Sequence, residues 1–278
     1  MTVTKTENGI LLSNIGCFDP FVSCECGQCF RFLKISDHEY RVFAGSRAVT
    51  VKKLGGDWLF TGTDKEGFDG FWRAYFDLDR DYAKIIKGFS RDKHLSEAAS
   101  SGSGIRIFRQ DPWETLVSFI ISQNNNIPRI KKIIFALCEL LGEPAESGTY
   151  SFPTPEAIVK AGVEGLAPIR SGFRAKYIVD AAQKTLSGAI DPEKIRKMPY
   201  EEAREELKKI KGVGDKVANC VLLFGYGFLG AFPVDVWVKK VIGKYYGEGF
   251  DPSVFGEYAG IAQQYLFYYE RNILTAKA

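Results

Sequence analysis

The hydrophobic pattern of this chain changes its period partway along its length. Up to about residue 62, apolar and polar residues alternate, and β-branched and aromatic residues are frequent. A period of two is typical of strands with one buried face. Turn residues such as Gly55 and Gly56 separate the segments. We therefore expect an antiparallel sheet that includes residues 29–35, 40–44, 48–54 and 57–62, followed by a helical transition over residues 64–98.

From Asp111 onward, apolar residues recur at the spacing of helices. The stretch DPWETLVSFIIS begins with Asp111 as a cap and Pro112 at the first helical position. Its apolar residues form one stripe, and Pro128 can begin a second helix. Further helices are expected from about residue 154, around residues 174–186, and over residues 200–210, 216–224, 236–246 and 254–269.

A sheet followed by a run of helices defines the fold class as α+β. We expect an N-terminal antiparallel sheet domain with its helical transition over residues 1–98. A mostly α-helical region is expected over residues 99–278. The helical region contains a helix, a tight glycine turn and a second helix at about residues 200–224.

The composition, 45% hydrophobic and 26% charged, is ordinary for a globular protein. No apolar run approaches the ~20 residues that span a bilayer, and the first residues lack the order of a signal peptide. We therefore expect an intracellular protein with no membrane partner, and six cysteines that are free thiols. The net charge of +3 does not by itself indicate a nucleic-acid partner. Three basic clusters, which either face phosphates together or are solvated helix ends, stand at residues 170–176, 208–216 and 239–244.

The glycine turn is the most specific local pattern. In KGVGDKVANC, we expect Gly212 and Gly214 to adopt positive φ and to leave no side chain above the turn. The exposed amides of Gly212, Val213 and Gly214, with the N-terminus of the next helix, would bind a DNA phosphate without reading sequence. The competing interpretation is an ordinary pair of antiparallel helices with a glycine turn.

Lys216 stands at the N-terminal end of that second helix, where the helix dipole disfavours a cation. An uncharged amine is a nucleophile suited to imine chemistry. Cys220 follows one turn later and either packs against a flat ring or is a buried helix cysteine. Asp235, in FPVDVWV, can cap the next helix, and can also stabilise positive charge that develops on a sugar.

Four further stretches stand in a fixed order around this core: CGQCFRF at 26–32, FRQDPWETLVSFIISQNNNIPRI at 108–130, SGFRAKYI at 171–178 and YAGIAQQYLF at 258–267. Together with GVGDKVANC and PVDV, they resemble the 8-oxoguanine DNA glycosylases of the helix-hairpin-helix, HhH-GPD superfamily. The similarity covers at least residues 24–267. It implies base excision from duplex DNA with an associated lyase step, no cofactor and no metal, and a monomer whose partner is DNA with 8-oxoguanine opposite cytosine.

The resemblance also implies roles for single residues. Lys216 would attack the sugar C1′, with Asp235 as its electrostatic partner. The Gly27 carbonyl would accept from the N7–H that only the oxidised guanine carries. Cys220 and Phe267 would sandwich the extruded base, and Gln263 would bond its Watson–Crick edge. The residues expected to face the unpaired cytosine and to wedge the duplex are Asn124, Arg129, Arg174 and Phe173.

The chain departs from the family pattern at two positions. Phe173 stands where many relatives have tyrosine, and Trp237 where they often have histidine, so one phosphate contact is in doubt. The thiols of Cys24, Cys26 and Cys29, with or without Cys17, could bind zinc, although their spacing is irregular for a structural site. Two different functions also fit the hairpin: a glycosylase for another damaged base, and a DNA-binding module without catalysis.

Overall fold

The computed structural model describes residues 1–145 and 148–275. Its six-stranded sheet is antiparallel throughout and has the strand order β1-β2-β6-β5-β4-β3. The strands are β1 (Thr2–Thr6), β2 (Gly9–Ser13), β3 (Phe32–Ser36), β4 (Glu39–Ala44), β5 (Arg47–Leu54) and β6 (Asp57–Thr61). The antiparallel sheet predicted from the alternating pattern is confirmed.

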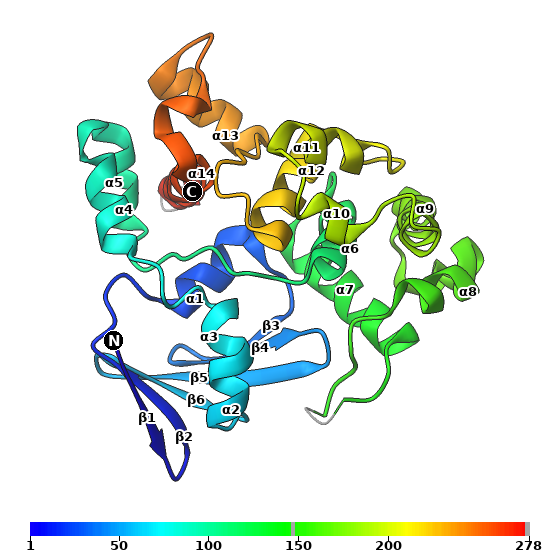
Figure 1. Ribbon diagram of the computed structural model, residues 1–278, viewed down its shortest axis with the longest axis horizontal. Coiled ribbons are helices and arrows are strands. Elements are labelled where there is room, and N and C mark those ends of the chain that lie inside the picture. The colour runs from blue at the N-terminus through cyan, green and yellow to red at the C-terminus, as the bar shows by residue number, and fades with distance from the viewer. Residues whose placement is uncertain (146–147, 276–278) are drawn as a thin grey trace.

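One face of the sheet is buried because the alternation places large side chains on the same side. Val49 and Val51 of β5 and Trp58 and Phe60 of β6 are buried, whereas their neighbours along each strand are partly exposed. The aromatic segment after β6 covers this face, with the Phe60 and Phe76 ring centroids 5.5 Å apart. Figure 1 shows α2 and α3 lying over the sheet, which occupies one end of the molecule.

The rest of the chain is mostly helical. The α-helices are α1 (Pro20–Ser23), α2 (Lys65–Gly67), α3 (Arg73–Tyr75), α4 (Tyr82–Gly88), α5 (Lys93–Ser101), α6 (Pro112–Ser122), α7 (Ile127–Leu141), α8 (Pro155–Gly165), α9 (Ala175–Leu186), α10 (Pro192–Ile195), α11 (Tyr200–Lys208), α12 (Asp215–Val221), α13 (Val236–Val241) and α14 (Ala259–Thr275). Short π-helical turns lie at Cys24–Gln28, Phe68–Trp72, Leu222–Tyr226 and Ile242–Tyr246, and 3-10 turns at Phe89–Arg91, Ala167–Ile169, Gly172–Arg174 and Pro252–Tyr258.

Side-chain caps fix where the central helices begin. The Asp111 carboxylate accepts from the Glu114 amide at 2.8 Å, with Pro112 in the first turn of α6. The Asn126 side chain accepts from the Arg129 amide at 3.0 Å and begins α7. Each cap satisfies an amide that would otherwise lack a partner in the first helical turn.

The helix predicted over residues 254–269 begins later than expected. Gly256 has φ +63°, and a 3-10 turn occupies Pro252–Tyr258, so α14 begins at Ala259. The left-handed backbone at Gly256 interrupts the helical ladder, and a glycine adopts it without steric cost.

Two large clusters of buried side chains meet at the loop after α1. Cys26 and Phe30 belong to the helical cluster, whereas Cys24, Cys29 and Phe32 belong to the sheet cluster. Residue 98, the expected end of the N-terminal domain, lies within α5, whose buried residues share the helical cluster with α14. The loop after α1 therefore lies where the sheet and the helices meet.

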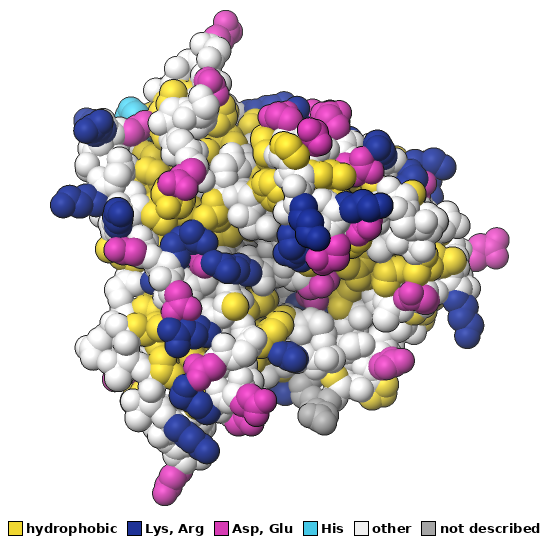
Figure 2. Space-filling model, in the orientation of Figure 1, with side chains coloured by type: hydrophobic (Ala, Val, Ile, Leu, Met, Phe, Trp, Pro, Cys, Tyr) yellow, Lys and Arg dark blue, Asp and Glu magenta, His cyan; other side chains and the backbone are white. Residues whose placement is uncertain are grey.

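The observed architecture confirms the α+β fold class. Within residues 1–145 and 148–275, no helix has the length and apolar character to cross a membrane. On the face shown in Figure 2, basic and acidic side chains are interspersed, which agrees with the small net charge of +3.

Candidate active site

The glycine turn joins α11 to α12 and depends on Gly212. This residue has φ +79°, and a Cβ added to it would lie 2.4 Å from Cδ2 of Tyr177 on α9. Both the backbone conformation and the close approach of the ring therefore require glycine. Figure 1 shows α9 beside the pair α11 and α12.

Gly214 differs from the sequence prediction. Its φ of −105° and ψ of −175° are extended, so the expected positive φ is wrong. Gly214 is instead the N-cap of α12, with open space where a Cβ would lie. Val213 is buried between the two glycines, and its amide donates to the Ile210 carbonyl at 3.0 Å. The tight turn thus depends on Gly212 and on the buried Val213. Because Gly214 has no side chain, the first backbone amides of α12 are left accessible at that point.

The carboxylate of Asp180 on α9 forms hydrogen bonds that hold the glycine turn in place. It accepts from the Lys211 amide at 2.8 Å and from the Lys184 ammonium at 2.9 Å. Burial alone would raise the pKa of Asp180, but these two bonds outweigh it and hold the pKa below its usual value. The charged carboxylate therefore holds the turn at neutral pH.

Lys216 lies in the first turn of α12 and is half-buried. Its Nζ lies 4.9 Å from the ring centroid of Phe119, a buried residue of α6. In the described part of the chain, Lys216 has no ion-pair partner. Cys220 lies one turn further along the same helix; burial raises the pKa of its thiol, and Lys216 opposes this effect. The amine is thus placed at a cavity rather than in a salt bridge.

Asp235 caps α13 across the cavity from α12. Its Oδ1 accepts from the amides of Trp237 at 3.0 Å and Val238 at 2.9 Å. The carboxylate also lines the cavity that Lys216 reaches. Trp237 itself contacts Lys240, whose Nζ lies 4.6 Å from the indole centroid. The two roles considered for Asp235, helix cap and cavity carboxylate, coexist in one geometry.

The cavity between these elements measures about 40 Å³. It is lined by Cys26, Gly27, Phe119, Lys216, Cys220, Phe224, Pro233, Asp235, Gln263, Gln264 and Phe267. Such a volume holds roughly one water molecule, so a purine can enter only if its walls move. The structure therefore brings together all six residues predicted for chemistry and base binding: Lys216, Asp235, Gly27, Cys220, Gln263 and Phe267.

Gly27 lies in the loop after α1, with φ +82°. A Cβ at this position would lie 3.5 Å from Cε1 of Phe267, so the ring of α14 closes over the glycine. The buried amide of Gln28 holds the loop: its Nε2 donates to the carbonyl of Arg106 at 2.7 Å, and its Oε1 accepts from the Phe108 amide at 2.7 Å. This network fixes the backbone around Gly27.

The residues predicted to face the opposite strand lie in two neighbouring loops. Asn124 is exposed, with φ +46°, and Arg129 is exposed and donates to the Arg170 carbonyl at 3.3 Å. Arg174 is buried and donates to the carbonyls of Gln123 at 2.9 Å and Asn124 at 3.0 Å. In this structure Arg174 thus connects the two loops.

Phe173 protrudes from the second of these loops. It is 48% exposed, whereas the next residue, Arg174, is buried. The Arg174 guanidinium carbon lies 4.5 Å from its ring centroid, and Tyr177 packs edge-on against it at 5.9 Å. One side of the Phe173 ring thus packs against Arg174 and Tyr177, and the rest of the ring is exposed to solvent.

Several residues that line or support the cavity are absent from the sequence prediction, among them Cys26, Phe224 and Pro233. Phe119 lies in the apolar helix 111–122, but its cation–π contact with Lys216 has no sequence signal. Gln28 and Gln264 fall within the quoted motifs CGQCFRF and YAGIAQQYLF without a role of their own. A glutamine inside an otherwise apolar helix or strand is the signal that could have found them, because a buried amide needs partners.

The cysteines do not form a metal site. All six are free, as predicted. Cys26 points into the helical cluster, whereas Cys24 and Cys29 belong to the sheet cluster. Burial raises the pKa of Cys24, and raises that of Cys26 to about 12, so both thiols are protonated at neutral pH. Over residues 1–145 and 148–275, no group of three His, Cys, Asp or Glu side chains is arranged to hold a metal ion, which leaves the zinc hypothesis without support.

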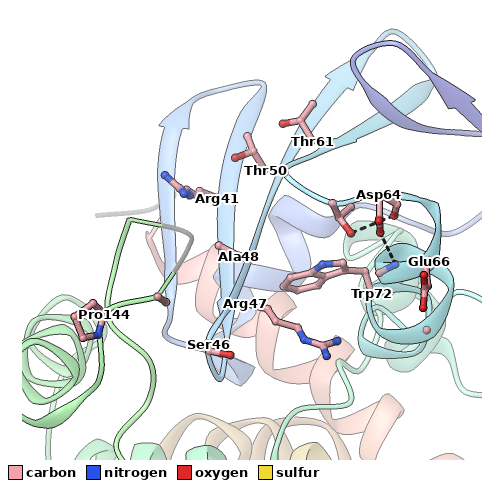
Figure 3. Close-up of a pocket in the computed structure, with 15 residues that line it drawn as sticks. Arg41, Ser46, Arg47, Ala48, Thr50, Thr61, Asp64, Glu66, Trp72 and Pro144 are labelled. Atoms are coloured by element: carbon pink, nitrogen blue, oxygen red, sulfur yellow. Dashed lines mark hydrogen bonds between the residues drawn. The ribbon is translucent and has the colours of Figure 1, made fainter.

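A wider cleft of about 920 Å³ lies at the sheet and is a separate feature (Figure 3). Its walls include Arg41, Thr50, Thr61 and Asp64. Asp64 is engaged as the cap of α2, where it accepts from the Gly67 amide at 2.7 Å. The cleft shares no lining residue with the Lys216 cavity among the described residues.

Two family models of known proteins match adjacent parts of this chain. Residues 117–253 match the model of the HhH-GPD superfamily of base excision DNA repair proteins, which agrees with the hairpin next to Lys216. Residues 11–116 match the model described as the N-terminal domain of 8-oxoguanine DNA glycosylase. This chain belongs to the 8-oxoguanine DNA glycosylase family, as its motifs predicted.

Individual relatives agree with this assignment. MBOgg1, solved with a low-affinity DNA ligand, is 44% identical, with a TM-score of 0.93 over 98% of both chains. The 8-oxoguanine glycosylase/lyase of Clostridium acetobutylicum, solved with double-stranded DNA containing cytosine opposite 8-oxoG, is 38% identical, with a TM-score of 0.93 over 99% of both chains. The N-glycosylase/DNA lyase of Saccharomyces cerevisiae is 36% identical over 62% of this chain, which spans about half of that relative.

Proposed function

We propose that this protein excises 8-oxoguanine from duplex DNA, with Lys216 as the nucleophile, and then cleaves the strand by β-elimination. One observation carries the proposal. The Lys216 amine, without an ion-pair partner among the described residues, and the Asp235 carboxylate line the same cavity. An amine and a carboxylate that converge on one cavity suit attack on a sugar carbon that gains positive charge.

The bond changes follow from these two groups. The Lys216 nitrogen bonds to C1′ as the C1′–N9 bond breaks, and the departing base takes that electron pair and a proton. The Asp235 carboxylate stabilises the positive charge on the sugar in the transition state. The nitrogen then loses a proton, the ring oxygen leaves C1′ with the electron pair of that bond and takes up a proton, and a protonated imine forms. Loss of a proton from C2′ expels the 3′ phosphate and cleaves the strand.

Recognition of the damaged base is proposed for the other walls of the cavity. Cys220 and Phe267 stack on the two faces of the base, which yields ~1–3 kcal/mol per stacked base. The Gly27 carbonyl accepts from N7–H, and Gln263 bonds the Watson–Crick edge. Because the cavity measures about 40 Å³ without DNA, Phe267 has to move away from Gly27 for the base to enter.

The remaining predicted residues are proposed to hold the duplex. The turn amides at Gly212 and Gly214 bind a backbone phosphate, whereas the Val213 amide, predicted for the same role, already donates to the Ile210 carbonyl at 3.0 Å. The exposed Phe173 fills the gap that the base leaves. Asn124, Arg129 and Arg174 contact the opposite cytosine, so equal turnover opposite adenine would count against them. A single chain carries both turn and cavity, so we propose that it acts as a monomer.

Borohydride trapping tests the proposal. With duplex DNA containing 8-oxoguanine opposite cytosine, the wild type should form a covalent complex, and Lys216→Gln should form none. Lys209→Gln is the matched control, because Lys209 lies in the same turn with its ammonium 2.6 Å from Glu206 and outside the cavity. Trapping of Lys216→Gln at the wild-type yield would remove Lys216 from the reaction. Binding of wild type without trapping would instead indicate a DNA-binding module, and trapping only on another damaged base a different glycosylase.

A further inference from the structure

A pocket of about 390 Å³ lies behind one wall of the Lys216 cavity. Its own walls include the segment between α5 and α6, which crosses the middle of the molecule in Figure 1, and the turn after α12. Phe224 of that turn lines the Lys216 cavity, whereas its neighbours Leu223 and Gly225 line the pocket. Gln110 also lines the pocket, and its amide donates to the Phe224 carbonyl at 2.9 Å. Among the described residues, the two spaces thus share a stretch of backbone but no lining residue.

Positively charged side chains outnumber negatively charged ones in the described wall of the pocket. Its charged lining residues are Arg80, Arg109, Arg196 and Asp77. Asp77 is buried, and its Oδ2 accepts from Nε of Arg80 at 2.6 Å. Its Oδ1 lies 2.7 Å from Nη2 of Arg109. One buried carboxylate therefore holds two guanidiniums side by side and neutralises only one of them.

The other two arginines near the pocket add to this positive charge. Arg106 is 3% exposed, and its Nη1 donates to the backbone carbonyls of Asp77 at 2.7 Å and Arg80 at 3.1 Å, which carry no full charge. Arg196 lies over the ring of Tyr226, with its guanidinium carbon 5.6 Å from the ring centroid. The carboxylate nearest to Arg196, on Glu193, lies 3.7 Å away and is 72% exposed, so water screens this ion pair.

Arginines in this arrangement suit the phosphate group of a small molecule. A guanidinium carries five N–H donors in one plane and binds phosphate oxygens in pairs. The contacts with Asp77 use Nε of Arg80 and Nη2 of Arg109, so other N–H groups of each arginine can face a ligand. Ile107, Leu223 and the half-buried Tyr226 supply an apolar and aromatic part of the same wall. The volume of about 390 Å³ falls in the range of ~300–1,000 Å³ that is typical of small-molecule sites.

We propose that this pocket binds a free nucleoside phosphate, with its phosphates on Arg109 and Arg196 and its base against the wall that includes Tyr226. The site differs from the one proposed for the extruded base, and it does not depend on the excision of any damaged base. A DNA strand presents the same phosphates, but each of them continues into a chain on both sides. The pocket has room for a single nucleotide, which favours the free molecule as its source.

Isothermal titration calorimetry of the full chain with ADP, adenosine and inorganic pyrophosphate tests the proposal. ADP should bind, adenosine should give no measurable heat, and pyrophosphate should bind more weakly than ADP because it lacks the base. Arg196→Gln and Arg109→Gln should each weaken ADP binding by about tenfold, as expected for the loss of a hydrogen bond to a charged group. Lys194→Gln is the matched control, because Lys194 lies two residues from Arg196, is 73% exposed and does not line the pocket.

Two further arms decide where ADP binds. Lys216→Gln should bind ADP as the wild type does, and ADP should stay bound when undamaged duplex DNA is added. Loss of binding in Lys216→Gln would assign ADP to the Lys216 cavity, and displacement by the duplex would assign it to the DNA-binding surface; either result overturns the inference. It is equally overturned if the wild type does not bind ADP, if adenosine or pyrophosphate binds as tightly as ADP, or if both arginine variants bind ADP as tightly as Lys194→Gln.

Discussion

At the scale of single residues, the two glycines of the turn have different tasks. Gly212 meets Tyr177 and has positive φ, whereas Gly214 has an extended backbone and open space where a side chain would lie. A pattern of two glycines two residues apart does not distinguish them, because the sequence does not reveal which one faces α9. Because the two glycines differ in this way, the stabilities of their alanine variants can be compared directly.

Gly212→Ala should therefore destabilise the protein clearly more than Gly214→Ala, which replaces only the N-cap of α12. The strained backbone alone costs about 1–3 kcal/mol, and the clash with Tyr177 adds to it, whereas a surface change without a clash stays within about 0.5 kcal/mol. Urea denaturation of both variants checks this. Equal stabilities would contradict the assignment of the close approach to Gly212.

Phe173 is the residue that we propose wedges the duplex. Because the ring is 48% exposed, Phe173→Ala should leave the melting temperature nearly unchanged. Excision should nevertheless slow by about tenfold, since an apolar wedge helps to hold the kinked duplex and a base costs a few kcal/mol to extrude. Single-turnover rates measure the effect, with thermal denaturation as the control for folding. A wild-type rate would exclude Phe173 as the wedge.

At the scale of elements, the turn between α11 and α12 is held by α9 through Asp180. The pKa of this carboxylate is lower in the folded protein than its usual value of ~3.9. Its contribution to stability is therefore fully present above pH ~3.9, the pKa expected in the unfolded chain, and is lost as the pH falls through the lower folded pKa.

Asp180→Asn should accordingly lower the free energy of unfolding at pH 7 by about 2 kcal/mol, the value of hydrogen bonds to a charged group. The difference from wild type should narrow below pH ~4. Chemical denaturation at several pH values between 7 and 3 measures both effects. A difference that stays constant over this range would show that the charge of Asp180 does not hold the turn.

Elements with strong local signals were predictable from the sequence. Helices α6 and α7 have caps and a clear apolar stripe, and burial alternates along the first part of β5 and along β6 as expected. The hairpin of β1 and β2 had no comparable signal, because β1 is TVTKT, an exposed edge strand with one hydrophobic residue. The start of the last predicted helix moved to Ala259 because Gly256 adopts φ +63°, which depends on tertiary packing.

At the scale of the whole molecule, the cavity is assembled from four distant parts of the chain. Gly27 comes from the loop after α1, Phe119 from α6, Lys216 from α12 and Phe267 from α14. The motifs identified which residues belong to the site, but not that Phe119 contacts the amine or that Phe267 covers Gly27. Such contacts follow from how the sheet and helices pack, and no short stretch of sequence encodes them.

Locating the covalent bond shows whether the amine of Lys216 reaches C1′ of the extruded nucleotide. The complex trapped by borohydride on 8-oxoguanine DNA is digested with nuclease and protease, and the peptide that carries the sugar remnant is sequenced by mass spectrometry. We expect the remnant on Lys216. A remnant on another lysine or on the N-terminal amine would contradict it.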